Sequence, residues 1–289
     1  MRTIQYNRNS EGLALDNETL RTLAPSIFAQ EAAPSRSSRF HVYPTSAVVD
    51  GMRDAGFLPV MAANVHVMRK DVEDRKLYAK HIIRFQQAEH VGAAMGEKPE
   101  VVLVNAHDGT SSYRLMAGMF RVVCSNGLVV AHTTVDQIRI PHRSNPLDVV
   151  AASIELSKHT PMLMDRVKAM QGIMLDDCTR EEMAREAARI RLGEDWRDKL
   201  ESASQLLALH RYEDMRPTLW NTFNALQENC TRGNRLVRLK PYYVEQNGHM
   251  VEKQRRFRSV HSLQNSISIN QQLWQMADRV YEQNKTVMV

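Results

Sequence analysis

The residues best suited to chemistry lie in a basic segment near the C-terminus, over residues 231–261. This segment carries eight Arg and Lys side chains against two carboxylates, so its net charge is +6, while the whole chain has a net charge of +5. The Asn247-Gly248 dipeptide in its middle is a typical hairpin turn. The sequence therefore predicts a basic β-hairpin with arms over residues 236–245 and 250–260.

Cations and aromatic residues are interspersed along this predicted hairpin, and the combination suits nucleic acid. Arg and Lys on a β-ribbon can contact successive phosphates, and aromatic rings can stack on unpaired bases. An alternative is a solvated surface ribbon whose arginines pack over aromatic rings and bind no ligand. The predicted nucleic-acid-binding residues are Arg232, Arg235, Arg238, Lys240, Tyr242, Tyr243, Lys253, Arg255, Arg256, Phe257 and Arg258.

A second group of chemically capable residues is the His107-Asp108 pair, together with His81 and Asn105. Histidine and carboxylate side chains can bind a metal ion or transfer protons near neutral pH. Asp-Gly turns are common, however, and no spacing here matches a metal-ligand pattern. We therefore favour a structural turn whose side chains bond the backbone, and we predict no metal and no catalytic residue at this place.

The three cysteines, Cys124, Cys178 and Cys230, are widely spaced and odd in number. This usage predicts a reduced protein without disulfides. Cys124 follows two valines and precedes Asn126 and Gly127, so we expect an inert buried thiol there, with a nucleophile as the alternative. The sequence has no phosphate loop, dinucleotide fingerprint or nucleophile elbow. We expect no cofactor, and the question of enzymatic activity stays open.

The central stretch over residues 100–130 must position the His107-Asp108 turn. Residues 101–104 form an apolar, β-branched run that predicts a buried strand. After the Asp108-Gly109 turn, apolar and polar residues alternate from Tyr113 to Ala117, which predicts a half-buried strand. Together these features predict a β-hairpin across Asp108-Gly109.

At these residues the chain resembles the phage- and plasmid-borne family of YfjQ/YafZ-type proteins. That family has a block close to N-S-H-D-G-(S/T), followed by one close to R-(L/V)-V-C-S-N-G-L. Ala106 departs from the pattern, because a serine is expected there. Similar blocks occur at residues 78–81 and 219–228, so the likeness spans roughly residues 39–274. The matching residues are Asn105, His107, Asp108, Gly109, Thr110, Arg121, Val122, Val123, Cys124, Ser125, Asn126, Gly127 and Leu128. The resemblance implies a protein of mobile elements.

The flanking sequence predicts an α+β protein with a mainly antiparallel sheet, then a helical region, a basic hairpin and a closing helix. The predicted domains are an N-terminal arm over 1–38, an α+β core over 39–143, a helical region over 144–229, and the hairpin with the closing helix over 230–289. The arm reads either as a partly ordered leader or as a subunit-bridging segment. The expected strands cover 40–43, 57–68, 77–85 and 137–140, and the expected helices cover 17–23, 45–55, 147–157, 162–174, 179–191, 196–209, 217–229 and 263–281.

Composition narrows the class of protein further. The chain has 289 residues and a hydrophobic fraction of 43%. No apolar run approaches the roughly 20 residues needed to cross a bilayer, and the N-terminus lacks the apolar segment of a signal peptide. We therefore expect a cytoplasmic protein that does not contact membranes.

The sequence thus favours a DNA-binding protein of mobile elements, acting in single-strand binding or annealing during recombination or replication, with a homo-oligomer compatible with that role. An alternative is a protein-interaction module that inhibits a host defence or regulatory system, because its 16 methionines could form an adaptable surface. A metal-dependent enzyme using His81, His107 and Asp108 is the third hypothesis.

Overall fold

The structure, a computed structural model, falls into two compact units, Met1–Met164 and Asp165–Val289. α5 (Thr160–Gly172) crosses the division between them. The structure describes residues 13–37, 43–64, 76–92, 97–121, 129–130, 137–142, 145–233, 237–246, 249–255, 257–260 and 262–287.

The first unit is built on an antiparallel sheet with the order β1-β2-β3-β4-β5, in which β6 also pairs with β4. β3 and β4 pair across the Asp108-Gly109 turn, which confirms the predicted hairpin. Gly109 has a φ of 76°, a backbone conformation that glycine adopts without steric cost. The strands are β1 (Phe57–Asn64), β2 (His81–Gln87), β3 (Glu97–Asn105), β4 (Tyr113–Arg121), β5 (Val129–Val130) and β6 (Gln137–Ile140).

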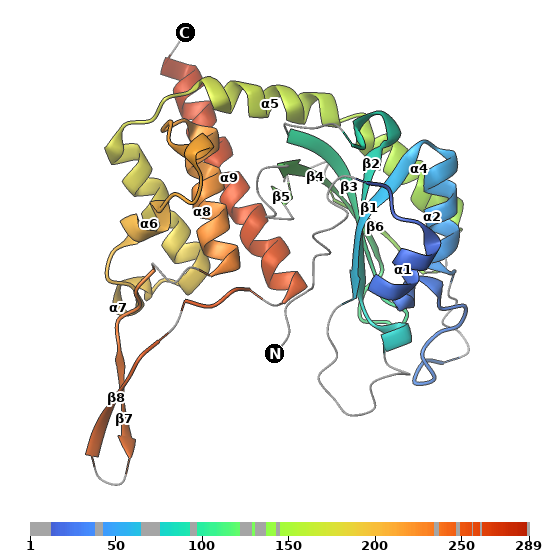
Figure 1. Ribbon diagram of the computed structural model, residues 1–289, viewed down its shortest axis with the longest axis horizontal. Helices are drawn as coiled ribbons and strands as arrows, with labels where there is room; N and C mark the ends of the chain where they lie inside the picture. The colour runs from blue at the N-terminus through green and yellow to red at the C-terminus, as the bar shows by residue number, and fades with distance from the viewer. Residues whose placement is uncertain are drawn as a thin grey trace. The chain divides into compact units, whose positions relative to one another are not determined.

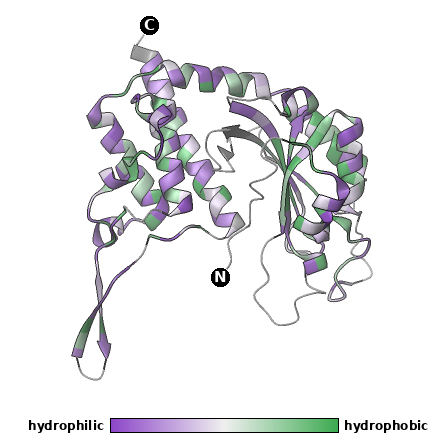
Figure 2. Cartoon of the chain, in the orientation of Figure 1, coloured by the Kyte–Doolittle hydropathy of each residue, from purple (hydrophilic) through white to green (hydrophobic). Residues whose placement is uncertain are grey.

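Helices cover one face of this sheet and form the core with it (Figures 1 and 2). They are α1 (Asn17–Leu23), the 3-10 helix η2 (Pro25–Phe28), α2 (Thr45–Asp54) and α4 (Pro146–Ser157). Alternate strand residues, such as Val101 and Leu103, point into this core because strand side chains have a period of two. A short 3-10 helix, η3 (Ala88–His90), follows β2.

Residues within 13–37, part of the predicted N-terminal arm, pack into this core. Leu20 and Ile27 are fully buried in the cluster, and the backbone N–H of Leu15 donates to the carbonyl of Pro59 at 2.7 Å. Further on, the N–H of Ala33 donates to the carbonyl of His107 at 3.1 Å. Apolar residues dispersed among polar ones concealed this packing in the sequence.

The opposite side of the central strands carries a buried ion pair. Arg84 on β2 binds Glu100 on β3, and its Nη2 donates to Oε1 at 2.7 Å. Gln86 donates to the same oxygen at 2.8 Å. Both charged residues are almost fully buried, at 3% and 2% exposure. The pairing therefore offsets part of the cost of burying the two charges.

The second unit contains helices and a separate two-stranded hairpin (Figure 1). Its core includes Trp220, Phe223 and Trp274, whose ring centroids lie 5.5 to 6.3 Å apart. The elements are α6 (Asp177–Leu192), α7 (Trp196–Lys199), η4 (Ala203–Leu207), η5 (Tyr212–Asp214), α8 (Leu219–Arg232), β7 (Tyr242–Gln246), β8 (His249–Lys253) and α9 (Leu263–Val287).

Several predicted boundaries need correction. α6 begins at an N-cap formed by Asp176, which accepts a hydrogen bond from the N–H of Thr179 at 2.7 Å, so Thr179 is inside the helix. The continuous helix predicted over 196–209 is wrong, because Leu200 is extended and forms a β-bridge with Leu239. Tertiary pairing overrides helix propensity there.

Other predicted elements are shifted or shorter. β2 begins at His81, four residues later than expected, and the hairpin strands are shorter than the predicted arms. The expected helix over 45–55 is confirmed, with Gly56 at a φ of 82° behind it. The predicted strand over 40–43 and the end of the one over 57–68 lie outside the described residues.

The two units divide the chain at a different place from the predicted Pro-rich boundary near residue 143. α4 belongs with the sheet, because Val149 and Leu156 are buried in the core of the first unit. The limits of the predicted domains stay predictions. No helix in the part of the chain that the structure describes is long and apolar enough to cross a membrane.

The buried ion pair gives a first prediction. Glu100→Gln should lower the free energy of unfolding by about 3–5 kcal/mol, because it removes the carboxylate that binds the Arg84 guanidinium in the protein interior. Lys158→Ala is the control, because it breaks an exposed pair with Glu155 and should cost less than about 1 kcal/mol. Urea unfolding measures both variants. Equal losses of unfolding free energy in the two variants would contradict the assignment of Arg84 and Glu100 as a buried ion pair.

Candidate functional site

The β7–β8 hairpin separates its charged side chains onto two faces. Residues directly opposite each other in an antiparallel pair share a face. Tyr242 is opposite Lys253, and the guanidinium carbon of Arg255 lies 5.0 Å from the centroid of the Tyr242 ring. These three residues define the cationic face of the hairpin.

The other face is acidic. Tyr243 is opposite Glu252, and Glu245 is opposite Met250. The Tyr243 hydroxyl donates to Glu252 at 3.2 Å, and this contact raises the pKa of Tyr243. Tyr243 and Met250 are the most exposed apolar side chains of the hairpin, at 59% and 67%. The two carboxylates of the basic segment therefore lie away from its cationic face.

The hairpin has little packing of its own, because each of its described residues is exposed or half-buried. An isolated two-stranded hairpin is marginally stable in water. Contacts at its base fix it instead. Leu239 bridges Leu200, and the backbone N–H of Lys240 donates to the carbonyl of Lys199 at 2.8 Å. The ribbon is thus held at one end and presents both faces to solvent.

The structure brings only part of the predicted binding set together. Lys240, Tyr242, Lys253 and Arg255 lie on or beside the hairpin, with Tyr243 on its acidic face. Arg235 and Arg256 lie outside the described residues. The side chains of Arg238 and Arg258 are exposed, but both residues lie outside the two strands.

Two members of the predicted set have other roles. Phe257 is only 8% exposed, and the guanidinium carbon of Arg191 lies 5.1 Å from its ring centroid. Its ring is therefore packed beneath an arginine and is not presented to a base. Arg232 donates to Glu228 at 2.9 Å, so it belongs to an internal ion-pair network.

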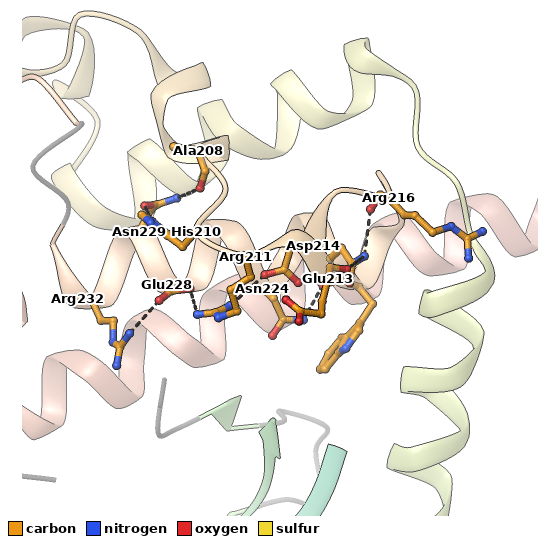
Figure 3. Close-up of polar contacts among 12 residues, drawn as sticks. Ala208, His210, Arg211, Glu213, Asp214, Arg216, Asn224, Glu228, Asn229 and Arg232 are labelled. Carbon is orange, nitrogen blue, oxygen red and sulfur yellow. Dashed lines mark hydrogen bonds and ion pairs between the residues drawn. The ribbon is translucent and has the colours of Figure 1, made fainter. Parts of the chain in front are cut away.

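That network surrounds α8 and was not anticipated from the sequence (Figure 3). Arg211 binds both Glu228 and Asp214, the latter at 2.9 Å. Asn229 donates to the carbonyls of Leu206 and Ala208 at 2.8 and 2.9 Å. These bonds fix the irregular segment before α8 onto the helix, so we assign them a structural role. The spacings of Arg211 with Asp214 and of Glu228 with Arg232 were the sequence signals for them.

The block at residues 105–109 forms part of a buried polar network in the first unit. Its centre is the hydroxyl of Thr45, in the first turn of α2. Asn105 Nδ2 donates to this oxygen at 3.0 Å, while His81 Nε2 and His107 Nε2 lie 3.1 and 3.2 Å from it. Residues from two separate family-like blocks therefore meet at one hydroxyl group.

The hydrogen bonds assign the protons in this network. Asn64 Nδ2 donates to the carbonyl of Lys76, so its Oδ1 accepts from the Ser26 hydroxyl at 2.6 Å. The Ser26 oxygen then accepts from His81 Nδ1 at 2.8 Å, which leaves His81 Nε2 as an acceptor.

The single hydroxyl proton of Thr45 is donated to Nε2 of His81. His107 must therefore donate to the Thr45 oxygen from Nε2. Each histidine thus has a defined neutral form in which one nitrogen carries the proton.

Burial keeps both histidines neutral. Desolvation, and secondarily the neighbouring His107, lowers the pKa of His81 to about 3. Desolvation followed by the neighbouring His142 lowers the pKa of His107 to about 4. To accept a proton near neutral pH, either histidine would first have to overcome the free-energy cost of carrying a charge in the protein interior.

Asp108 completes the turn beside these histidines. Asp108 accepts from the N–H and the hydroxyl of Thr110, at 2.9 and 2.6 Å, and so completes the turn. Within the described ranges no cluster of three His, Cys, Asp or Glu side chains could hold a metal ion. The structural interpretation of His81, His107 and Asp108 fits these contacts.

The remaining motif residues add little to the site. Arg121 ends β4, opposite Glu97 at the start of β3. Cys124, Asn126 and Gly127 lie outside the described residues, so the interpretation of that turn and thiol stays a prediction.

Comparison with known proteins identifies the family. A domain of unknown function, DUF932, matches residues 33–274. The chain belongs to the DUF932 family. It is 32% identical over 274 residues to the UPF0380 proteins YafZ and YfjQ of Escherichia coli (strain K12), covering 93% of this chain and 92% of each relative. These matches confirm the family resemblance seen in the sequence. No solved structure matches the chain.

The buried histidines predict a pH-dependent stability. Unfolding exposes His81 and His107 to water, where their pKa returns to about 6.5, so below that pH the unfolded state binds more protons. The free energy of unfolding should therefore fall as the pH drops from 6.5 towards 4, by up to about 1.4 kcal/mol per pH unit for each histidine. Urea unfolding across this range measures the slope.

The matched variants are His107→Gln and His249→Gln. The first removes a buried titrating group and should make the profile shallower. The second changes an exposed histidine of the hairpin and should leave the slope as in the parent. A flat profile for the parent protein would contradict the neutral buried histidines.

Proposed function

We propose that this protein binds DNA through the cationic face of the β7–β8 hairpin, in single-strand binding or annealing during recombination or replication of a mobile element. The observation that carries the proposal is the separation of charge on the ribbon, with Tyr242, Lys253 and Arg255 together and both glutamates on the other side. A cytoplasmic location is part of the proposal, because such DNA is replicated and recombined there.

The chemistry of the cationic face suits an unpaired strand. The ammonium group of Lys253 and the guanidinium group of Arg255 supply donors for phosphate oxygens. Tyr242, at 39% exposure, supplies a ring face for a base once Arg255 moves from the ring to a phosphate. Contacts of these kinds follow the backbone and read no particular sequence, as an annealing role requires.

The acidic face gives the second candidate function its support. Tyr243 and Met250 expose apolar surface beside Glu245 and Glu252, and an adaptable methionine next to an aromatic ring suits a protein partner. This face would serve a module that inhibits a host defence or regulatory protein. Recovery of one stoichiometric host protein that resists nuclease treatment, and its loss in Met250→Glu, would favour this function.

Charge reversal tests the cationic face. The double variant Lys253→Glu/Arg255→Glu should bind a single-stranded oligonucleotide more weakly, because two phosphate contacts are replaced by repulsion. The slope of log K against log salt should become shallower by about 1.4, at roughly 0.7 per phosphate lost from a single strand. Fluorescence anisotropy across a salt series measures it.

The control for this test is Lys168→Glu/Lys285→Glu, which reverses two exposed cations on α5 and α9. It makes the same change in net charge but should retain most of the affinity. If both double variants lose affinity equally, the effect is that of net charge alone and the hairpin is not the site.

Alanine variants of the two hairpin tyrosines distinguish a loss of base stacking from a general loss of protein stability. Tyr242→Ala should weaken binding to single strands by about 1–3 kcal/mol, the usual contribution of one stacked base. Tyr243→Ala removes the same ring from the acidic face and should leave affinity close to that of the parent. Anisotropy at constant salt compares the two variants. A larger loss of affinity for Tyr243→Ala would place the binding surface on the acidic face and contradict the proposal.

A further inference from the structure

A pocket of about 340 Å³ lies at the base of the hairpin, within the second unit. It is lined from α6, α7, the start of η4 and the residue that leads into β7. A volume of this order suits a small molecule or part of a larger one. The lining residues that matter here are Arg185, Trp196, Arg197, Ser202, Ser204 and Lys240.

Two of these lining residues are cations whose charge is not already neutralised. Among the residues that the structure describes, neither Arg197 nor Lys240 has a carboxylate partner. The guanidinium carbon of Arg197 lies 4.8 Å from the Trp196 ring centroid, and Lys240 Nζ donates to the carbonyl of Arg197 at 2.7 Å. An ammonium group has three N–H donors, so Lys240 keeps two for a ligand. Arg185, by contrast, is paired with Glu181 at 2.8 Å.

Trp196 forms a buried wall of the pocket. Its side chain is 6% exposed, and its indole N–H, which has no acceptor in the described part of the chain, is buried from solvent and from a ligand in the pocket. Glu181 and Glu201 also line the pocket, so three cations stand against two carboxylates there. Arg197 and Lys240 are therefore the donors that remain for an anionic oxygen.

The pocket continues from the cationic face of the hairpin. Lys240 lies two residues before Tyr242, which begins β7. Arg255 contributes to lowering the pKa of Asp195, the residue before Trp196, although the hydrogen bond from Lys199 has the larger effect. Positive charge therefore extends from the ribbon to the pocket at its base.

We propose that this pocket holds one phosphate group, with its attached nucleoside, of the DNA strand that follows the cationic face. Arg197 and Lys240 supply the charged donors, and the Trp196 ring forms the wall beneath Arg197. The inference rests on the proposed function and deepens it, because it gives the strand a fixed point at the base of the hairpin. A free nucleotide carries the same phosphate chemistry and is the other source that the experiment must separate.

The test compares Arg197→Gln/Lys240→Gln with the control Lys168→Gln. Anisotropy with a single-stranded oligonucleotide should show a loss of about tenfold or more for the pocket variant, as expected for charge-assisted hydrogen bonds, and a salt slope shallower by about 0.7. The control should bind like the parent protein. Arg197→Gln alone is the second variant, in case loss of the Lys240 bond impairs folding.

Tryptophan fluorescence gives a readout at the pocket itself. Titration of the parent protein with the oligonucleotide should change the emission, and the change should be absent in Trp196→Phe, because Trp220 and Trp274 are buried in the core. If the pocket variants bind DNA like the parent while Lys253→Glu/Arg255→Glu does not, the pocket proposal is wrong and the hairpin function stands.

A free nucleotide provides the last arm of the experiment. Thymidine monophosphate should compete with the oligonucleotide only weakly, because it lacks the contacts along the ribbon. Competition at concentrations as low as those needed for the oligonucleotide would assign the pocket to a free ligand and overturn its place on the strand. If the parent binds thymidine monophosphate but no DNA, the proposed function fails as well.

Discussion

The alternation of side chains across a β-ribbon is the constraint on which the functional interpretation depends. Pairing of β7 with β8 forces successive residues onto opposite faces, so the sequence order of charges becomes a spatial separation. If the charges of this segment, which sum to +6, were mixed on both faces, neither face would be specialised for phosphate. Instead, Lys253 and Arg255 lie with Tyr242, and the carboxylates lie with Tyr243. The ribbon therefore has one face that attracts phosphate and one that repels it.

Desolvation is the corresponding constraint in the first unit. The side chains around Thr45 are all buried, so each must find a partner inside the protein or remain without one. Their hydrogen bonds fix the form of His81 and His107 and join α2 to β2 and β3. A network of this kind stabilises one arrangement of the turn at Asp108.

The sequence predicted the local features that depend on short-range chemistry. The Asp108-Gly109 hairpin, the helix that starts at Thr45 and the helix over 17–23 follow from turn and periodicity rules, and the structure confirms them. Features set by distant contacts were missed. Leu200 is extended because it pairs with Leu239, and no pattern within residues 196–209 reports that bridge.

In the candidate site, too, the sequence predicted the features that depend on local residues and missed those that depend on tertiary contacts. Clustered charge and the Asn247-Gly248 dipeptide predicted a basic hairpin, and β7 pairs with β8 in an antiparallel ladder. Counting cations could not show that Arg232 is engaged by Glu228, or that Phe257 is covered by Arg191. The first is a pair within α8 whose carboxylate lies outside the counted segment, and the second depends on α6, which is far away in the sequence. The pocket at Trp196 could not be predicted either, because its lining residues come from separate segments of the sequence.

The most direct test of the account is fluorescence anisotropy of the parent protein with single- and double-stranded oligonucleotides across a salt series. The account predicts binding that favours single strands and weakens steeply as salt rises, because phosphate contacts release counterions. An absence of binding at low salt would contradict the central claim and direct attention to a protein partner for the hairpin.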